Sequence, residues 1–374
     1  MTFRPSAGEA LPILAIAFVV AAVISLLLTP WVRGRALRHG VVDRPIARRV
    51  NLQPVPRGGG VAVVLAFLAV ATVLVVVNER LGMVRTPVAL DTGQMVALLG
   101  GGAAAAALGA VDDYLDLRAR WQLVGQVALA VGAVVLGIDI AFVNNPFGAG
   151  QIRFNETFAA GFTILWILGM VNSVNFIDGL DGLSSGIALI ASVTLGVISL
   201  TADINQPFVA LLCFVLAGSL LGFLRWNFHP AAIFTGTSGT MFVGYTLAIL
   251  SILGSAKVAV ALLVLGVPII DTFWIIVRRV LAGRSPFTPD RGHIHHRLLD
   301  LGLSHRQTVV LIYAICAALG VLSLVLSGAN QVYAFLGVLV GTGVILLFLA
   351  WGGFRESGLE AESYDPTDTS DAPR

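Results

Sequence analysis

Charged residues are scarce in this sequence. Asp, Glu, Lys and Arg together make up 12% of its 374 residues, whereas soluble domains carry about 25%. Hydrophobic residues reach 57%, and the mean hydropathy is +0.90. Because so few polar groups are present to cover a water-facing surface, the composition excludes an ordinary soluble protein and indicates one with several membrane spans.

Cysteines and long polar segments are also rare. The two cysteines, Cys213 and Cys316, lie within apolar runs, which excludes a disulfide framework and a cysteine-based metal site. The longest connections between apolar runs, near 31–59 and 278–307, contain about 30 residues each, too few for an independent soluble domain. Any chemistry must therefore be built from short loops at the membrane surface.

The apolar runs predict an all-α, polytopic membrane protein. A membrane helix needs about 20 mostly apolar residues, and eleven runs come close to this length. These runs lie near 11–30, 60–77, 94–111, 121–138, 158–175, 184–201, 207–224, 239–255, 257–277, 308–326 and 331–351. Within the third run, residues 100–107 are all glycine or alanine, which favours close packing against a neighbouring helix.

The distribution of basic residues predicts the orientation in the membrane. Of the 23 Lys and Arg residues, 18 fall on the side that holds the odd-numbered connections and the C-terminus. Because cytoplasmic loops carry the excess of Lys and Arg, we expect the N-terminus outside, the C-terminus inside and the polar motifs in cytoplasmic loops. Residues 1–352 should form one domain in the cytoplasmic (inner) membrane, and residues 353–374, which are acidic and rich in Ser, Thr and Pro, a disordered tail.

Residues 172–183 carry two aspartates, Asp178 and Asp181, each followed by glycine at the end of an apolar run. Glycine allows a sharp turn and the close approach of a ligand to the main chain. Asn172, Asn175 and Asp178 recur every three residues and could share one helix face. A capped helix end with an Asp-Gly turn is the structural alternative, but two such pairs beside two asparagines favour a functional site.

A second acidic cluster, Asp112, Asp113 and Asp116, follows the third apolar run. In a helix Asp112 and Asp116 would lie on the same face, where like charges repel unless a cation lies between them. An acidic helix end balanced by Arg118 and Arg120 is the alternative. Three acids within five residues at a membrane boundary favour a ligand.

Residues 236–240, Gly-Thr-Ser-Gly-Thr, open the eighth apolar run. Backbone N–H groups at a helix N-terminus bind phosphate, so this segment predicts a phosphate site. Capping of the helix by the side chain of Thr237 or Ser238 is the alternative of equal weight.

Three of the six histidines, His293, His295 and His296, fall within four residues. Such a tract is a candidate zinc site, but Arg291 and Arg297 lie among the histidines and would repel a cation. Arginine binds phosphate oxygens in a bidentate manner. Phosphate binding is therefore the preferred interpretation.

Two further charged positions stand out. Arg57 directly precedes three glycines at the start of the second run, where contact with anionic lipid is the alternative to a site. Asp271 lies within the ninth run, with Arg278 seven residues further on and on the same face. A neutralising ion pair between Asp271 and Arg278 is the preferred interpretation.

These motifs, in this order, resemble the polyprenyl-phosphate N-acetylhexosamine-1-phosphate transferases, and most closely the bacterial undecaprenyl-phosphate N-acetylglucosaminyl-1-phosphate branch. The residues that carry the resemblance are Asp112-Asp113-x-x-Asp116, Asn172-x-x-Asn175-x-x-Asp178-Gly-x-Asp181-Gly, Pro230-Ala-x-x-Phe234 and His293-Ile-His295-His296-Arg297. The resemblance covers about residues 43–306 and includes the plan of eleven spans with the N-terminus outside. It implies transfer of a sugar 1-phosphate from a UDP-sugar to undecaprenyl phosphate at the cytoplasmic face, with Mg²⁺ or Mn²⁺ as cofactor and UMP as product.

The resemblance also implies roles for individual residues. The implied catalytic residues are Asp112, Asp113, Asp181 and His293, and the implied metal ligands are Asp112, Asp113 and Asp181. The implied substrate-binding residues are Asn172, Asn175, Asp178, Arg57, Thr237, His295, His296 and Arg297. Membrane lipids are expected to surround the protein, no nucleic-acid partner is expected, and homodimer formation is left open.

Two positions depart from the family pattern. Thr237 stands where the family usually carries a metal-binding aspartate, and Gln122 stands where it usually carries a lysine. The sequence therefore leaves two alternatives to an active transferase. One is a catalytically impaired scaffold that binds the lipid carrier or the nucleotide, and the other is a transporter of a lipid-linked or anionic substrate. A transporter would more often place its site at the membrane midplane between repeated halves, and no internal repeat is evident here.

Overall fold

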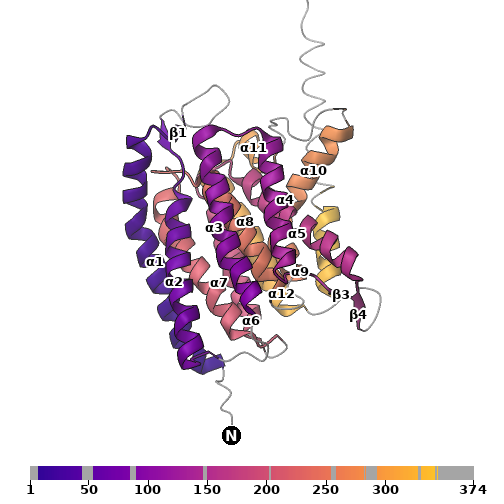
Figure 1. Ribbon diagram of the computed structural model, residues 1–374. Coiled ribbons are helices and arrows are strands. Elements are labelled where there is room, and N and C mark those ends of the chain that lie inside the picture. The colour runs from indigo at the N-terminus through magenta and orange to yellow at the C-terminus, as the bar shows by residue number, and fades with distance from the viewer. Residues whose placement is uncertain are drawn as a thin grey trace, which may run out of the picture.

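The computed structural model describes residues 7–43, 54–84, 90–145, 150–201, 204–253, 258–281, 283, 293–326, 330–341 and 343. The described part is a bundle of helices with two short hairpins (Figure 1). The first eight helices are α1 (Ala7–Arg38), α2 (Gly60–Leu81), α3 (Thr92–Leu115), α4 (Ala119–Val135), α5 (Glu156–Ile177), α6 (Leu183–Ser199), α7 (Pro207–Asn227) and α8 (Gly236–Ile252). They are followed by α9 (Val258–Val264), α10 (Gly266–Leu281), α11 (Ile294–Asp300), α12 (His305–Val325) and an apolar helix over Asn330–Gly341.

The first to eighth and the tenth predicted runs each coincide with a described helix, and residues 331–341 of the eleventh are also helical. Six of the described helices are long and apolar enough to cross a membrane, or seven if α9 and α10 count as one span. The helices α4, α6, α8 and Asn330–Gly341 are apolar but shorter. The protein is thus a polytopic, all-α membrane protein, while the count of eleven spans and the orientation stay predictions. The predicted acidic tail, 353–374, lies outside the described residues.

The ninth run departs from the expectation of one span over 257–277. It is broken into α9 and α10, whose axes differ by 78°. Pro268 lies in the first turn of α10. Because proline has no N–H, it cannot donate to the carbonyl of Val264 and so cannot continue α9. The break turns α10 toward the end of the bundle that carries the loops (Figure 1).

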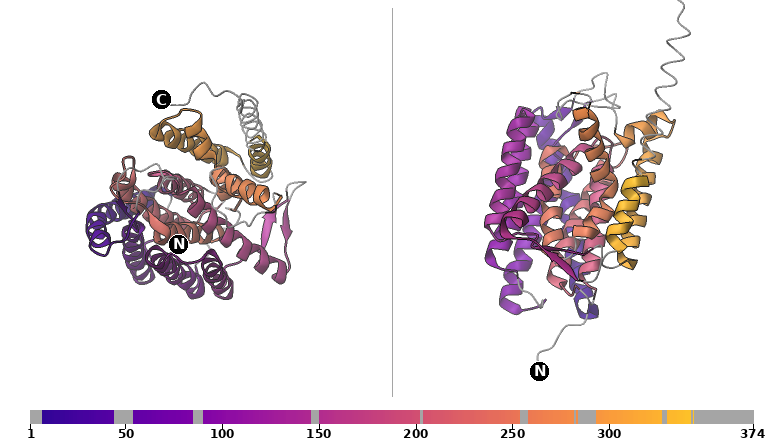
Figure 2. Two further views of the ribbon diagram at one scale, coloured as in Figure 1. Left: turned by 90° about the horizontal axis from the view of Figure 1, so that it is seen from above. Right: turned by 90° about the vertical axis from the view of Figure 1, so that its right-hand side faces the viewer.

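Small residues allow the helices to approach closely, as the glycine and alanine content of residues 100–107 predicted. A Cβ atom on Gly101 of α3 would lie 2.1 Å from the hydroxyl of Tyr245 of α8, and this hydroxyl donates to the Ala97 carbonyl at 2.8 Å. A Cβ atom on Gly222 of α7 would lie 2.1 Å from the Ala22 carbonyl oxygen of α1. The helices α7 and α8 form the centre of the bundle, and α12 packs at its side against α6 and α9 (Figure 2).

Two antiparallel hairpins, which the sequence did not predict, lie in connections between helices. Strand β1 (Val42–Asp43) pairs with β2 (Val55–Pro56), and β3 (Phe142–Asn144) pairs with β4 (Gln151–Arg153). Figure 1 shows β1 and α11 at the end of the bundle opposite the N-terminus, where the polar motifs also gather. We call this the loop end.

Candidate active site

A cavity of about 340 Å³ lies at the loop end. Its polar lining consists of Asp43, Arg57, Asp113, Asn175, Asp178, Asp181, Asn227, Thr235, Thr237, His296 and His305. Four aspartates thus face one arginine and two histidines. With four carboxyl groups and one guanidinium, the cavity offers more acidic than basic groups, a composition that suits a cation.

The glycine run after Arg57 brings this arginine to the cavity. The N–H group of Gly60 donates to the Thr235 carbonyl at 2.8 Å, and a Cβ atom on Gly60 would lie 2.2 Å from Cα of Gly239. The N-termini of α2 and α8 therefore meet with almost no space between their backbones. Arg57 Nε lies 4.0 Å from Asp43 Oδ1, and both residues line the cavity.

Asp113, from the end of α3, caps the N-terminus of α8. Its Oδ1 accepts from the Thr237 N–H at 2.8 Å, and its Oδ2 accepts from the Ser238 N–H at 3.0 Å. A carboxylate at a helix N-terminus interacts favourably with the helix dipole. The alternative in which Thr237 or Ser238 itself caps α8 is therefore wrong, since the cap comes from a distant helix. The two N–H groups that predicted a phosphate site are already bound to Asp113.

Asp112 lies outside the cavity lining and binds the connection between α3 and α4. Its Oδ1 accepts from the Leu117 N–H at 3.0 Å and from Gln122 Nε2 at 2.6 Å. Gln122, one of the two departures from the family pattern, is thus the partner of Asp112. Asp116 has φ 54° and ends α3, so it leaves the helix face that it was expected to share with Asp112.

The Asp-Gly-Leu-Asp-Gly turn joins α5 to α6. Asp178 Oδ1 accepts a short hydrogen bond from the Ser184 hydroxyl. A Cβ atom on Gly179 would lie 2.3 Å from Nε2 of His295, so this glycine admits a histidine ring. Gly182 has φ 79°, a left-handed conformation that side chains with a Cβ atom rarely adopt. The two glycines therefore allow a sharp turn and a close approach to the main chain, as the sequence predicted, but the group that approaches is His295 and not a ligand.

Asp178 lies where its charged form is disfavoured. Burial raises the pKa of the Asp178 carboxyl to about 7, the hydrogen bond from Ser184 opposes this increase, and the neighbouring carboxylates of Asp113 and Asp181 add to it. A cation beside these groups would favour the charged form. The cluster is therefore electrostatically suited to a positively charged ligand.

The two asparagines of the motif contact different neighbours. Asn172 donates to Gln126 Oε1 of α4 and to the Leu168 carbonyl, both at 2.8 Å. Asn175 accepts from the Thr240 hydroxyl of α8 at 2.8 Å. Asn172 thus joins α5 to α4, and Asn175 joins α5 to α8 at the cavity wall.

Asp181 is bound by two histidines that the sequence analysis missed. His229 Nδ1 lies 2.7 Å from Asp181 Oδ2, which also accepts from the Ala231 N–H at 3.1 Å. The N–H group of Asp181 donates to His305 Nε2 at 2.9 Å. His229 is adjacent to the Pro-Ala segment that carries the resemblance, which was the available signal for it. His305 belongs to none of the sequence motifs, so no signal in the sequence pointed to it.

The histidine tract is attached to α10 through Asp271. His293 Nδ1 lies 2.7 Å from Asp271 Oδ2, and the Ile294 N–H donates to Asp271 Oδ1 at 2.9 Å. Both oxygens of Asp271 are thus used at the start of α11, instead of in the ion pair with Arg278 that the sequence favoured. Since Asp271 is 2% exposed, this contact fixes the tract to the bundle.

The remaining members of the tract differ in their surroundings. His296 lines the cavity, whereas His295 is 1% exposed and has no hydrogen-bond partner on either ring nitrogen. Burial lowers the pKa of the His295 imidazole well below its ordinary value, and the neighbouring His296 and His293 lower it further. Arg297 lies on α11 outside the cavity lining, and Arg291 lies outside the described residues.

The structure therefore divides the predicted site residues into two groups. Those that line the cavity are Arg57, Asp113, Asn175, Asp178, Asp181, Thr237 and His296. Those that lie outside its lining are Asp112, Asn172, His293, His295 and Arg297. Asp43 and His305 line the cavity and were not predicted to belong to a site. The individual catalytic, metal-binding and substrate-binding roles stay predictions.

The cavity fits the divalent cation that the resemblance implies. Asp181 Oδ1 has no hydrogen-bond partner among the described residues and is not sealed from solvent, and the Asp178 carboxyl, which binds the Ser184 hydroxyl, lines the same cavity. Mg²⁺ prefers such carboxylate oxygens together with water and substrate phosphates. One ligand atom each of Asp181, His229 and His305 also lies within 4.8 Å of the others, so these three residues are close enough together to be considered as a metal site.

A helical membrane protein with an acidic cavity at one end suits an enzyme that handles anionic substrates at the membrane surface. Comparison with known proteins agrees with this class. Residues 95–255 match the model of glycosyl transferase family 4. The chain is 36% identical to a probable undecaprenyl-phosphate N-acetylglucosaminyl 1-phosphate transferase of Bacillus subtilis over 328 residues, which cover 85% of this chain and 86% of the relative.

Two further relatives have similar names. A decaprenyl-phosphate N-acetylglucosaminephosphotransferase of Mycolicibacterium smegmatis is 33% identical, with 92% of this chain and 90% of the relative covered. An undecaprenyl-phosphate alpha-N-acetylglucosaminyl 1-phosphate transferase of Thermotoga maritima is 29% identical, with 87% and 94% covered. The chain belongs to this family of polyprenyl-phosphate sugar-1-phosphate transferases, which confirms the resemblance and the assignment as a membrane transferase.

Proposed function

We propose that the protein transfers N-acetylglucosamine 1-phosphate from its UDP derivative to undecaprenyl phosphate at the cytoplasmic face of the membrane and releases UMP. The product would be the first lipid-linked intermediate of a cell-envelope polysaccharide. The observation that carries the proposal is the cavity at the loop end, where Asp113, Asp178 and Asp181 face Arg57 and His296. The relatives' names supply the sugar and the class of acceptor.

The reaction joins two anions. An oxygen of the lipid phosphate forms a bond to the phosphorus that carries the sugar, the bond to the bridging oxygen of the diphosphate breaks, and its electron pair leaves with UMP. The second pKa of a phosphate is near 6, so the acceptor is largely ionised at neutral pH and needs little help from a general base. The main barrier is the repulsion between the reactants.

The residues of the cavity are suited to reduce this repulsion. A bound Mg²⁺ or Mn²⁺ would neutralise charge on the diphosphate, and the carboxylates of Asp178 and Asp181 are the groups that we assign to hold it. Arg57 and His296 line the same cavity as these acids, where they can bind phosphate oxygens. Asp113 holds the N-terminus of α8, and hence Thr237, in the cavity wall.

Turnover by the purified protein tests the proposal. Protein in detergent is incubated with undecaprenyl phosphate, Mg²⁺ and a panel of UDP-sugars, and UMP is measured. UMP release that requires the acceptor, the metal and the N-acetylglucosamine nucleotide is expected. Release with a different sugar would correct the donor, and a parallel reaction with decaprenyl phosphate tests the acceptor.

Thr237 motivates a second candidate function, a scaffold that binds the lipid carrier or nucleotide without turnover. The threonine lines the cavity where the family usually carries a metal-binding carboxylate. A parent protein without UMP release at any Mg²⁺ concentration, and activity in the Thr237→Asp variant, would identify the scaffold. An active parent whose Mg²⁺ requirement falls in Thr237→Asp would place position 237 near the metal of a working enzyme.

A further inference from the structure

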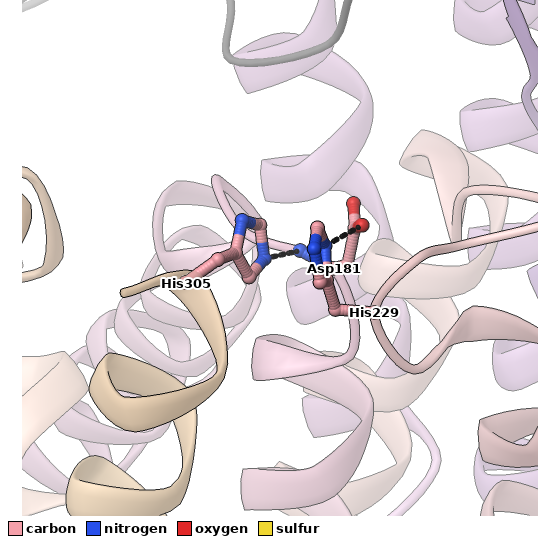
Figure 3. Close-up of side chains that lie close together, drawn as sticks. All are labelled: Asp181, His229 and His305. Atoms are coloured by element: carbon pink, nitrogen blue, oxygen red, sulfur yellow. Dashed lines mark hydrogen bonds and ion pairs between the residues drawn. The ribbon is translucent and has the colours of Figure 1, made fainter. Parts of the chain in front are cut away.

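Two histidines contact Asp181, one at its side chain and one at its main chain (Figure 3). His229, from the connection that follows α7, binds the side chain through Nδ1 at 2.7 Å from Oδ2. His305, the first residue of α12, accepts from the backbone N–H at 2.9 Å. The side chain and the main chain of one aspartate are therefore fixed by two different helical connections.

The two rings are stacked, with centroids 4.1 Å apart and planes inclined by 19°. The lone pair of an imidazole nitrogen lies in the plane of its ring. Nearly parallel rings at this separation therefore direct their nitrogens side by side, whereas the ligands of a metal ion must converge on one point about 2.0–2.2 Å away. The nitrogens that face Asp181 are also already used in hydrogen bonds. This geometry suits orientation of Asp181 better than direct binding of a metal by the three residues.

The segment that carries His229 is itself anchored. The Arg306 guanidinium donates to the His229 carbonyl at 3.1 and 3.3 Å, and Arg33 Nε donates to the Ala232 carbonyl at 3.0 Å. Asn227 Nδ2 donates to the Ile233 carbonyl at 3.0 Å. Residues from α1, α7 and α12 thus hold this connection in place, so His229 is a rigid partner for Asp181.

The consequence concerns the second oxygen of Asp181. Oδ2 is occupied by His229 and Ala231, while Oδ1 has no hydrogen-bond partner among the described residues and is not sealed from solvent. Asp181 lines the cavity. Since the carboxylate cannot rotate without breaking two hydrogen bonds, Oδ1 is held in one position at the cavity wall.

We propose that His229 and His305 are positioning residues, which orient Asp181 so that its free oxygen is ready to bind a divalent cation. The inference rests on the proposed function, since the cation is the one which that reaction requires. Groups that orient a metal ligand typically contribute 10–100-fold to metal affinity. The stacked rings of His229 and His305 would thereby restrain an aspartate that lies in a short turn with a glycine on either side.

Binding of Mn²⁺ to the metal-free protein in detergent, measured by electron paramagnetic resonance without substrates, tests the proposal. His229→Asn places an amide N–H near the position of Nδ1, and His305→Gln places an amide oxygen near the position of Nε2. We expect these variants to bind Mn²⁺ within about threefold of the parent affinity. His229→Ala and His305→Ala should bind it at least about tenfold more weakly.

His39→Ala is the matched control, because His39 is exposed just beyond α1 and lies outside the cavity lining. Thermal unfolding of every variant shows whether the fold is retained. Loss of Mn²⁺ binding in the Asn and Gln variants as well would identify the histidines as direct ligands and overturn the proposal. Unchanged affinity in the Ala variants, or no Mn²⁺ binding by the parent, would also overturn it.

The proposed function can fail separately. A parent that binds Mn²⁺ with the expected dependence on His229 and His305, but releases no UMP with any UDP-sugar, would retain the positioning role and reject the transferase reaction. Conversely, an active parent whose Mn²⁺ affinity and Mn²⁺ requirement are unaffected by both Ala variants would retain the transferase and reject the positioning role.

Discussion

The aspartates at the loop end are of two kinds. Asp113 and Asp271 use both carboxylate oxygens in hydrogen bonds at the start of a helix, α8 and α11 respectively. Asp181 uses only Oδ2 and leaves Oδ1 accessible at the cavity, and Asp178, which also lines the cavity, binds hydroxyl groups instead of a helix N-terminus. The first pair connects helices and the second pair is available to a ligand, although all four would look alike as acids near membrane boundaries.

This difference has a simple physical basis. A helix N-terminus presents several N–H groups that lack partners within the helix, and a carboxylate with two oxygens satisfies two of them. Asp271 and Asp181 each bind one imidazole and one backbone N–H group, but these partners lie on separate oxygens in Asp271 and on the same oxygen, Oδ2, in Asp181. The arrangement of the partners around the carboxylate therefore decides which oxygen stays available to a cation.

The largest effect is expected for Asp181→Asn. Removal of the charge at the cavity should lower turnover about 100-fold, or about 2.7 kcal/mol of transition-state stabilisation, with little change in thermal stability. UMP release measures the first and thermal unfolding in detergent the second. Asp300→Asn, an exposed acid at the end of α11, is the control. A large loss of stability without loss of turnover per folded molecule would group Asp181 with Asp113 and Asp271, the aspartates that connect helices.

Asp113→Asn should act mainly on stability. The amide retains one acceptor for the N-terminus of α8 but turns an NH₂ group toward the other N–H donor. A buried donor without a partner costs about 1–3 kcal/mol, so the thermal midpoint should fall measurably. If Asp113→Asn is as stable as the parent and inactive, Asp113 belongs with Asp181 as a ligand of the cavity.

Asp271→Asn should have a smaller effect on turnover than Asp181→Asn. The substitution weakens the contact with His293 and the start of α11, and a hydrogen bond contributes about 1 kcal/mol. We expect a lower thermal midpoint and a turnover within about tenfold of the parent. Hydrogen exchange of the α11 amides would show the loosened attachment. A loss of turnover equal to that of Asp181→Asn, with unchanged exchange, would contradict the structural role.

The smallest effect is expected for His295, which is buried without a hydrogen-bond partner while the neighbouring His296 lines the cavity. Because burial lowers the pKa of His295, its imidazole binds a proton less readily in the folded protein than in the unfolded chain. Stability is therefore retained at pH 7 and lost as the pH falls below about 6.5, by at most about 1.4 kcal/mol per unit. His295→Gln should flatten the decline of the thermal midpoint between pH 7 and pH 5, and a decline equal to that of the parent would place the titrating group elsewhere.

The sequence by itself determined the class of protein, the positions of the helices and the loops that carry the site. Apolar runs of membrane length leave few other conformations, and the order of the motifs was specific enough to indicate the family that the relatives confirm. The break between α9 and α10 was also encoded locally by Pro268. The break was missed because hydropathy gives the length of an apolar run but does not show where proline removes a backbone hydrogen bond.

The tertiary structure decided which polar groups meet. Asp112 and Asp113 are adjacent in the chain, yet one faces Gln122 and the other caps α8, because successive helical residues point in different directions. His229 and His305 are separated from Asp181 by 48 and 124 positions. No local pattern joins residues so far apart. Only the packing of α6, α7 and α12 brings them together, and with them the orientation of the carboxylate at the cavity.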